Sequence, residues 1–350
     1  MKRAGLWHGH DSQPDAGHRL TKTDYEENFP MYQPTTCRVF LFAGTILLSS
    51  LAFADDEELD ELYRKGGACT RTSIAALRSC KLQHESESWL ARGKCNNLAD
   101  PAKRAKCETE AIAAIEVGED ECDEQYDARQ ALCKALGEDA YEPKFDPSMF
   151  VKPADIGKSV QPNPYFPLVP GRTLIYQGGG QTITYAVTAE TREILGVRCA
   201  VIRDVVTTKD GVLEDTIDWY AQDNQGNVWY FGEVAQNFED GRLANLGGSW
   251  FAGVDGAKPG IIMKANPAAG NLYRQEFFLG SAEDMSEVTS ITGTTRTPAA
   301  ACVGNCLITR DFSPVEPGVN TTKTYAPGIG LIAEENPVTK VRKELVEIKN

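Results

Sequence analysis

The strongest constraint in this sequence is a symmetrical series of six cysteines. They are Cys69, Cys80, Cys95, Cys107, Cys122 and Cys133, and the steps between them are 11, 15, 12, 15 and 11 residues. The series is a palindrome centred on Pro101, so the residue numbers of its outer, middle and inner pairs add to one constant total. Residues that face each other across two antiparallel helices joined by one turn obey this constant-sum rule. The series therefore predicts a helical hairpin.

The spacing also suits the geometry of α-helices. Steps of 11 and 15 residues are close to three and four helical turns, so each arm keeps its cysteines near one stripe. Asp100-Pro101 is typical of a helix start, with Asp as the N-cap and Pro in the first turn. We predict the disulfides Cys69–Cys133, Cys80–Cys122 and Cys95–Cys107. They would stabilise a hairpin that buries too little apolar surface to be stable alone.

An apolar run before the hairpin predicts export. Arg38 precedes an apolar core over 39–53, a small-x-small cleavage pattern ends at Ala54, and an acidic run begins at Asp55. The core is short for a membrane span, so we interpret it as a secretory signal peptide. We expect a periplasmic or secreted protein with no transmembrane span in its mature chain. We take Met31 as the true start, and the alternative is an unusually long leader.

The chain divides into four predicted segments. They are 1–54, a mis-assigned extension plus a signal peptide that is removed; 55–137, the disulfide-linked helical hairpin; 138–170, a Pro-rich linker; and 171–350, an antiparallel β domain. In the last segment, short runs of β-branched and aromatic residues alternate with turn sequences, and no helical pattern lies between them. We therefore predict an α+β fold in two domains, the second a curved sheet, half-barrel or sandwich.

Charge and histidine content exclude several function classes. The net charge of −14 argues against binding to nucleic acid, which requires clustered Lys and Arg. Export would leave His84 as the last of four histidines, so we expect no His-rich metal site, no catalytic triad and no cofactor. We interpret the acidic run 116–127 as a solvated helix face, with a cation- or partner-binding face as the alternative.

Three cysteines lie beyond the hairpin. Cys199 and Cys306 occupy similar contexts, RCAVIRD and NCLITRD, and could bridge two neighbouring strands. The competing pair is Cys302–Cys306, which would close a short loop. Either choice leaves one cysteine that is free or available for an intermolecular bond.

Several long motifs resemble an exported bacterial protein family of unassigned function. They are NPYFPLVPG (163–171), DWYAQDNQGNVWYFGE (218–233), GVDGAKPGI (253–261) and YAPGIGLI (325–332). The resemblance covers about half of the chain and implies an exported, all-β domain without an established activity. The opening and closing motifs are also similar to the curved sheets of lipoprotein-carrier-like proteins.

Two sets of residues are candidates for a site. A possible ligand groove comprises Trp219, Tyr220, Trp229, Tyr230, Phe231 and Glu276, with core packing as the alternative for the aromatic residues. A carboxylate pair for acid–base chemistry could come from Asp218, Glu276, Glu283, Asp284 and Glu287. Because no spacing fixes the geometry that such a pair needs, we assign no catalytic residue.

These observations favour a non-enzymatic exported protein. Its β domain would bind a small apolar ligand, an envelope component or a protein partner. The alternatives are a carboxylate-dependent hydrolase and a structural or interaction module that uses the acidic hairpin. A hydrolase requires an acid pair within about 10 Å in a cleft, whereas an apolar cavity favours ligand binding over an interaction module.

Overall fold

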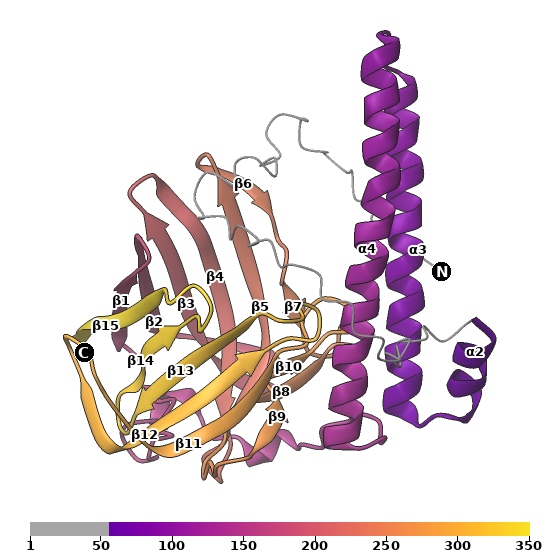
Figure 1. The fold of residues 1–350 in the computed structure, drawn as a ribbon. Coiled ribbons are helices and arrows are strands. Elements are labelled where there is room, and N and C mark those ends of the chain that lie inside the picture. The colour runs from indigo at the N-terminus through magenta and orange to yellow at the C-terminus, as the bar shows by residue number, and fades with distance from the viewer. Residues whose placement is uncertain (1–55) are drawn as a thin grey trace, which may run out of the picture. The chain divides into compact units, whose positions relative to one another are not determined.

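The computed structural model describes residues 56–350, which form three helices followed by an antiparallel β-sheet (Figure 1). The helices are α2 (Asp56–Lys65), α3 (Ala68–Asn96) and α4 (Pro101–Leu136). The α+β fold class predicted from the sequence is confirmed. The predicted signal peptide, the start at Met31 and the first three histidines lie outside the described residues.

Helices α3 and α4 form the predicted hairpin, and three disulfides join them. The paired Cα atoms are 5.6 Å apart in Cys69–Cys133, 5.8 Å in Cys80–Cys122 and 5.5 Å in Cys95–Cys107. Helix α4 begins as predicted, because the side chain of Asp100 accepts hydrogen bonds from the backbone N–H groups of the first turn. The constant-sum pattern thus fixes both the antiparallel arrangement and the register of the two helices.

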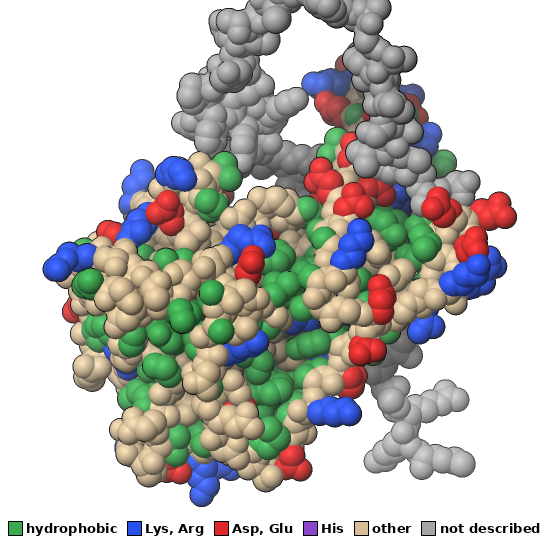
Figure 2. Space-filling model, turned by 60° about the horizontal axis from the view of Figure 1, so that its bottom comes forward, with side chains coloured by type: hydrophobic (Ala, Val, Ile, Leu, Met, Phe, Trp, Pro, Cys, Tyr) green, Lys and Arg blue, Asp and Glu red, His purple; other side chains and the backbone are tan. Residues whose placement is uncertain are grey.

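The two helices of the hairpin pack closely near the middle disulfide, Cys80–Cys122. A Cβ atom on Gly118 would lie 2.4 Å from Nδ1 of His84, so only a glycine lets the helices approach this closely. Helix α2 is held against α3 by a cluster of buried side chains beside Cys122, which are Leu59, Ile74 and Leu77. Most of the acidic residues of 116–127 are exposed, and Figure 2 shows acidic side chains gathered over the helical part of the visible face.

The segment after α4 covers one face of the sheet. It contains two short 3₁₀ helices, η1 (Pro147–Met149) and η2 (Pro153–Asp155). The rings of Phe145 and Phe150 pack edge-on against Trp229 and Phe231, with centroids 5.6 to 5.8 Å apart. The backbone N–H of Val151 donates to the backbone oxygen of Gln222 at the end of strand β4. This segment therefore buries the convex face of the strands that carry the site.

Within residues 56–350, fifteen strands form one sheet in which every pairing between strands is antiparallel. Their bounds are β1 Thr173–Gly178, β2 Gln181–Ile194, β3 Val197–Thr208, β4 Gly211–Gln222, β5 Val228–Glu239, β6 Arg242–Asn245, β7 Trp250–Phe251, β8 Lys258–Met263, β9 Leu272–Arg274, β10 Glu276–Phe277, β11 Met285–Arg296, β12 Ala301–Phe312, β13 Asn320–Ala326, β14 Gly330–Glu335 and β15 Arg342–Lys349. The hydrogen-bonded order is β10-β8-β5-β4-β3-β2-β1-β15-β14-β13-β12-β11-β9, with β6 and β7 added to β5. Figure 1 shows the sheet bending into a half-barrel with a concave side.

Turn residues close the hairpins where the sequence places them. The DNQGN turn joins β4 to β5, and the carboxylate of Asp223 accepts hydrogen bonds from Gln225 N, Asn227 N and the indole of Trp229. The YAPGIG segment turns between β13 and β14, with Ile329 N donating to Ala326 O. Neither glycine-rich segment forms a strand–loop–helix phosphate site, because strands flank both.

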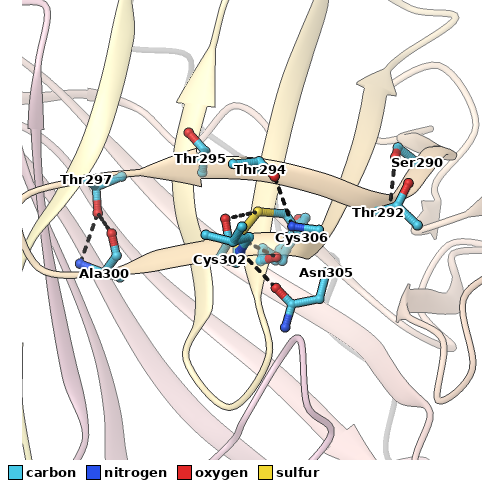
Figure 3. Close-up of a disulfide and its surroundings, with 12 residues drawn as sticks. Ser290, Thr292, Thr294, Thr295, Thr297, Ala300, Cys302, Asn305 and Cys306 are labelled. Carbon is cyan, nitrogen blue, oxygen red and sulfur yellow. Dashed lines mark hydrogen bonds between the residues drawn. A yellow bond between two sulfur atoms is a disulfide. The ribbon is translucent and has the colours of Figure 1, made fainter.

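The predicted Cys199–Cys306 bridge is wrong, and the competing pair is the one that forms. Cys302 and Cys306 are joined within β12, with Cα atoms 5.3 Å apart (Figure 3). Cys199 lies on β3, which pairs with β2 and β4, whereas β12 pairs with β11 and β13. Similar local sequences therefore do not place these two cysteines on neighbouring strands. Cys199 is a free, buried thiol whose pKa is raised by burial.

The strand pair β11–β12 is irregular around this disulfide. The register of β11 against β12 shifts on both sides of Gly293, and the backbone N–H of Gly304 donates to Oγ1 of Thr294 (Figure 3). Asn305 caps the same loop by accepting from Val303 N at 3.1 Å. The disulfide thus closes a bulge at one end of the hairpin.

Candidate ligand-binding site

The concave side of the sheet contains an apolar pocket of about 180 Å³. Its apolar and aromatic lining includes Tyr165, Phe166, Leu174, Tyr176, Ile183, Ile329 and Leu331. These side chains come from the segment before β1 and from β1, β2 and β14, which are neighbours through β15 in the sheet. The curvature of the sheet brings them to one hollow, which has the composition of a small-molecule site.

A second hollow, the carboxylate pocket, has a volume of about 220 Å³. Its acidic lining residues are Asp204, Glu214, Asp218, Glu233, Glu276 and Asp284. It shares Tyr185, Asp204 and Tyr220 with the apolar pocket, so the two are adjoining parts of one concave site. One side of the site is therefore apolar and the other is lined by carboxyl groups.

The pairing of β4 with β5 places Asp218 directly opposite Glu233. Side chains opposite each other in an antiparallel pair have Cβ atoms about 4.5–5.5 Å apart. The hydroxyl of Tyr230 donates to Oδ1 of Asp218 at 2.6 Å, and the hydroxyl of Tyr220 lies 3.4 Å from the same oxygen. The two tyrosine rings stack with centroids 4.5 Å apart, which holds both hydroxyls in place.

Burial shifts the protonation of these carboxyl groups. It raises the pKa of Asp218 to about 7. Burial, followed by the charge of Asp218, raises the pKa of Glu233 to about 8. Burial likewise raises the pKa of Asp204 to about 8. Burial and the neighbouring Asp284 and Glu233 raise the pKa of Glu276 well above its usual range. The pocket is thus partly protonated at neutral pH.

Glu276 lacks the partners that a buried carboxylate normally has. The residue is 6% exposed, and it has no ion pair within residues 56–350. The indole N–H of Trp250 lies beside it and favours its anionic form, without forming a well-aligned hydrogen bond. One oxygen of Asp204, Oδ1, is also buried without a hydrogen-bond donor. Buried polar groups of this kind are costly unless a partner reaches them.

The basic residues around the site already have partners. Lys323, the one basic residue that lines the carboxylate pocket, lies 3.0 Å from Asp311. Lys343 lines the apolar pocket and lies 3.6 Å from Glu334. Arg172, at the same pocket, donates from Nη1 to the backbone oxygen of Gly328, whereas its Nε is buried without an acceptor. These pairings leave the carboxylate pocket with an excess of acidic groups.

A buried ion pair connects helix α4 to the edge of the site. Arg129 donates from Nε to both oxygens of Glu283 at 3.1 Å and from Nη2 to Oε1 at 2.7 Å. Arg129 is 5% exposed and Glu283 1% exposed. Asp284, the next residue, is solvent-accessible and lines the carboxylate pocket. The ion pair therefore links the position of the hairpin to one wall of the site.

The structure divides the predicted groove residues between the two faces of the sheet. Tyr220, Tyr230 and Glu276 line the carboxylate pocket. Trp219, Trp229 and Phe231 lie on the opposite face, where Trp219 stacks on Phe251 and the other two pack against Phe145 and Phe150. Packing is therefore the role of these three rings.

The predicted carboxylate candidates also separate. Asp218, Glu276 and Asp284 line the pocket, whereas Glu283 pairs with Arg129 and Glu287 pairs with Arg310. Glu233, Glu214 and Asp204 belong to the pocket but were not predicted. The DNQGN turn predicts that its two flanking strands pair, but a simple count outward from it brings Gly232 opposite Asp218. The register shift at Trp219/Tyr220 is what brings Glu233 there, and the sequence gives no sign of it.

One further group of potential metal ligands is Cys80, His84 and Cys122 in the hairpin, whose ligand atoms lie within 4.8 Å of one another. Its two sulfur atoms are bonded to each other, so neither is a thiolate that could bind a metal. No set of three carboxyl groups within residues 56–350 gathers its oxygen atoms as tightly. The carboxylate pocket is therefore too open to be a compact single-ion site.

No family model matches the chain, and no curated protein matches it in sequence. A crystal structure from Parabacteroides distasonis ATCC 8503, described as that of a "putative lipoprotein", is similar over 54% of this chain and 100% of its own. The sequence identity is 15% and the TM-score 0.31. The resemblance to an exported family thus stays a prediction. Among the helices of residues 56–350, none has the length and apolar character that a membrane span requires.

Proposed function

We propose that the protein is an exported binding protein without catalytic activity that holds a small ligand in the concave side of its sheet. The observation that carries this proposal is the apolar pocket beside Phe166 and Leu331, which adjoins the carboxylate pocket. Concave sites with an apolar lining and a few convergent polar groups are the usual form of small-molecule sites. The ligand would place its apolar part in the apolar pocket.

Export is supported by the cysteines and by the sequence before the hairpin. Four disulfides lie within residues 56–350, and such bonds persist in oxidising compartments. The apolar core over 39–53 precedes them. We infer a mature chain that begins near residue 55, with a hairpin over 55–137, a linker over 138–170 and a β domain over 171–350.

The hairpin would serve as a rigid arm for the binding domain. Its disulfides fix the register of α3 and α4, and the Arg129–Glu283 ion pair fastens α4 to a wall of the site. The surface of the arm is acidic, which would suit contact with a basic partner.

A carboxylate-dependent hydrolase is the second candidate, and the Asp218–Glu233 pair favours it. Glycoside cleavage uses a pair of carboxyl groups, and these two residues face each other on neighbouring strands. However, such chemistry needs one group protonated and its partner ionised. Here burial raises the pKa of both groups, to about 7 and about 8, so the pair can hold one proton near neutral pH and meets that requirement. We rank binding above hydrolysis because the adjoining apolar pocket serves a ligand and has no part in such a reaction.

Native mass spectrometry of the intact protein, purified from its own envelope fraction, tests the proposal. We expect a small bound molecule that is lost on denaturation, a mature chain that begins near residue 55, and four disulfides. Phe166→Ala should reduce the bound fraction, whereas Phe312→Ala, beside Arg310 and outside the pockets, should not. A chain that never carries a ligand, or a Phe166→Ala variant that retains it fully, contradicts the proposal.

A further inference from the structure

The chemistry of the site also indicates which class of small molecule it accepts. This step rests on the proposed function and concerns the charge of the ligand. We propose that the ligand is an amphiphilic amine, with its ammonium group among Asp218, Glu233 and Glu276 and its apolar part beside Phe166 and Leu331.

The excess of carboxyl groups is the first argument. Six acidic residues line the carboxylate pocket, and Lys323, its one basic residue, is paired with Asp311 outside it. Like charges at this density repel one another, and the site responds by holding protons. A positively charged ligand would replace those protons and let several groups ionise together.

The unpaired polar atoms are the second, independent argument. Glu276 is almost fully buried and lines the pocket, with the indole N–H of Trp250 as a neighbouring donor and no ion pair within the described chain. Oδ1 of Asp204 lacks a donor at the boundary between the two pockets. An ammonium group carries N–H donors and no acceptor, so it offers what both residues lack.

The shape of the site favours an organic cation over a metal ion. The oxygens of the pocket are too widely spaced to surround one small ion, as the absence of any tight carboxylate triplet within residues 56–350 indicates. The adjoining apolar pocket would be left empty by a metal ion or by a purely hydrophilic polyamine. An amine with an apolar part fills both pockets.

An anionic amphiphile is the main rival, because three basic residues lie near the apolar pocket. Lys323 and Lys343 are already in ion pairs, and Arg172 donates to the backbone oxygen of Gly328. Nε of Arg172 is buried without an acceptor, so an anionic head group could gain one hydrogen bond there. It would otherwise have to break the ion pairs of Lys323 and Lys343 or enter among carboxyl groups. The structure therefore favours a cationic head group.

Titration calorimetry with three probes of equal chain length tests the sign of the charge. The intact protein is titrated at pH 8 with octylamine, 1-octanol and octanoate, and separately with spermidine and Ca²⁺. We expect octylamine to bind at least about 10-fold more tightly than any other probe, because it alone supplies both a cation and an apolar chain.

Two variants locate the head group. Glu276→Gln keeps the shape of the side chain and should weaken octylamine at least about 5-fold without changing octanol binding. Glu287→Gln, which removes a carboxylate outside both pockets, should change neither.

The outcomes separate the two proposals. If octanol or octanoate binds as tightly as octylamine, or if Glu276→Gln leaves octylamine unaffected, the amine inference fails and the binding function stands. Tighter binding of spermidine or Ca²⁺ also overturns the amphiphilic amine. If no probe binds and the native protein carries no ligand, both proposals fail.

Discussion

The hydroxyl of Tyr230 donates a 2.6 Å hydrogen bond to Asp218, on the strand directly alongside its own. This contact lies where the carboxyl group of Glu233 also faces Asp218. The tyrosine provides a neutral donor where two acidic groups would otherwise repel each other. The concave site is therefore built to tolerate acidic groups in a buried position, and its behaviour should depend on pH.

Stability should fall as the pH rises from about 4 to about 8. The folded pKa values of Asp218 and Glu233, about 7 and about 8, lie above the ordinary carboxyl values of 3.8 and 4.5. The folded state therefore holds more protons than the unfolded state in this window, so the free energy of unfolding decreases as protons leave. Urea unfolding at several pH values should show a decline on the order of a few kcal/mol.

Substitution identifies the groups responsible for that decline. Asp218→Asn should flatten the dependence of stability on pH, because a neutral amide does not titrate. Asp210→Asn, in an exposed turn, should leave the wild-type slope unchanged. A steep, unaltered slope in Asp218→Asn would refute the assignment to this site.

Tyr230→Phe should raise the pKa of Asp218 further. The substitution removes the donor that favours the ionised form of Asp218, worth about 1.5–3 kcal/mol for a hydrogen bond to a charged group. We expect the midpoint of the Asp218 carboxyl signal in NMR titration to move upward. Tyr63→Phe, on the exposed surface of α2, is the control and should not move it. A downward shift would show that the hydroxyl does not stabilise the anion.

The hairpin could be predicted in full from the sequence because covalent bonds impose a numerical rule. Constant-sum spacing specifies antiparallel pairing, register and turn position together, and Asp100 supplied the N-cap. The same rule, applied outward from the DNQGN turn, would place Gly232 opposite Asp218, whereas the structure places Glu233 there. A bulge at Trp219/Tyr220 shifts the register by one residue and hides that relationship from a simple count.

Long-range strand order could not be predicted in the same way. The proposed Cys199–Cys306 bridge assumed that two similar strands are neighbours, whereas the sheet order places five other strands between β3 and β12 along its path. The face on which an aromatic ring lies also depends on what covers the sheet. Trp229 and Phe231 pack against a segment near Phe145, roughly 80 residues earlier in the sequence.

Removing a hairpin disulfide should destabilise the protein. Cys80→Ser/Cys122→Ser should lower the free energy of unfolding by about 2–4 kcal/mol, because the unfolded chain gains freedom. Cys199→Ser changes a free buried thiol and removes no crosslink. Peptide mapping without reductant should recover Cys302 joined to Cys306. A Cys199 crosslink, or an equal loss of stability in both variants, would contradict this account.

Breaking the buried Arg129–Glu283 pair should destabilise the contact between the hairpin and the sheet. Arg129→Met leaves Glu283 buried without its cation, a change that costs about 3–5 kcal/mol for buried pairs. Adding Glu283→Gln should restore part of the loss. Arg203→Met, which breaks an exposed pair with Asp215, should cost at most about 1 kcal/mol. If Arg129→Met and Arg203→Met lower the free energy of unfolding equally, burial of the Arg129–Glu283 pair does not increase its contribution to stability.

The most direct measurement is a crystal structure of the intact protein with octylamine. We predict the nitrogen within hydrogen-bond distance of Glu276 or of the Asp218–Glu233 pair, and the alkyl chain beside Phe166 and Leu331. An amine bound with its nitrogen at the Phe166 end, or bound outside the concave side of the sheet, would contradict the central claim.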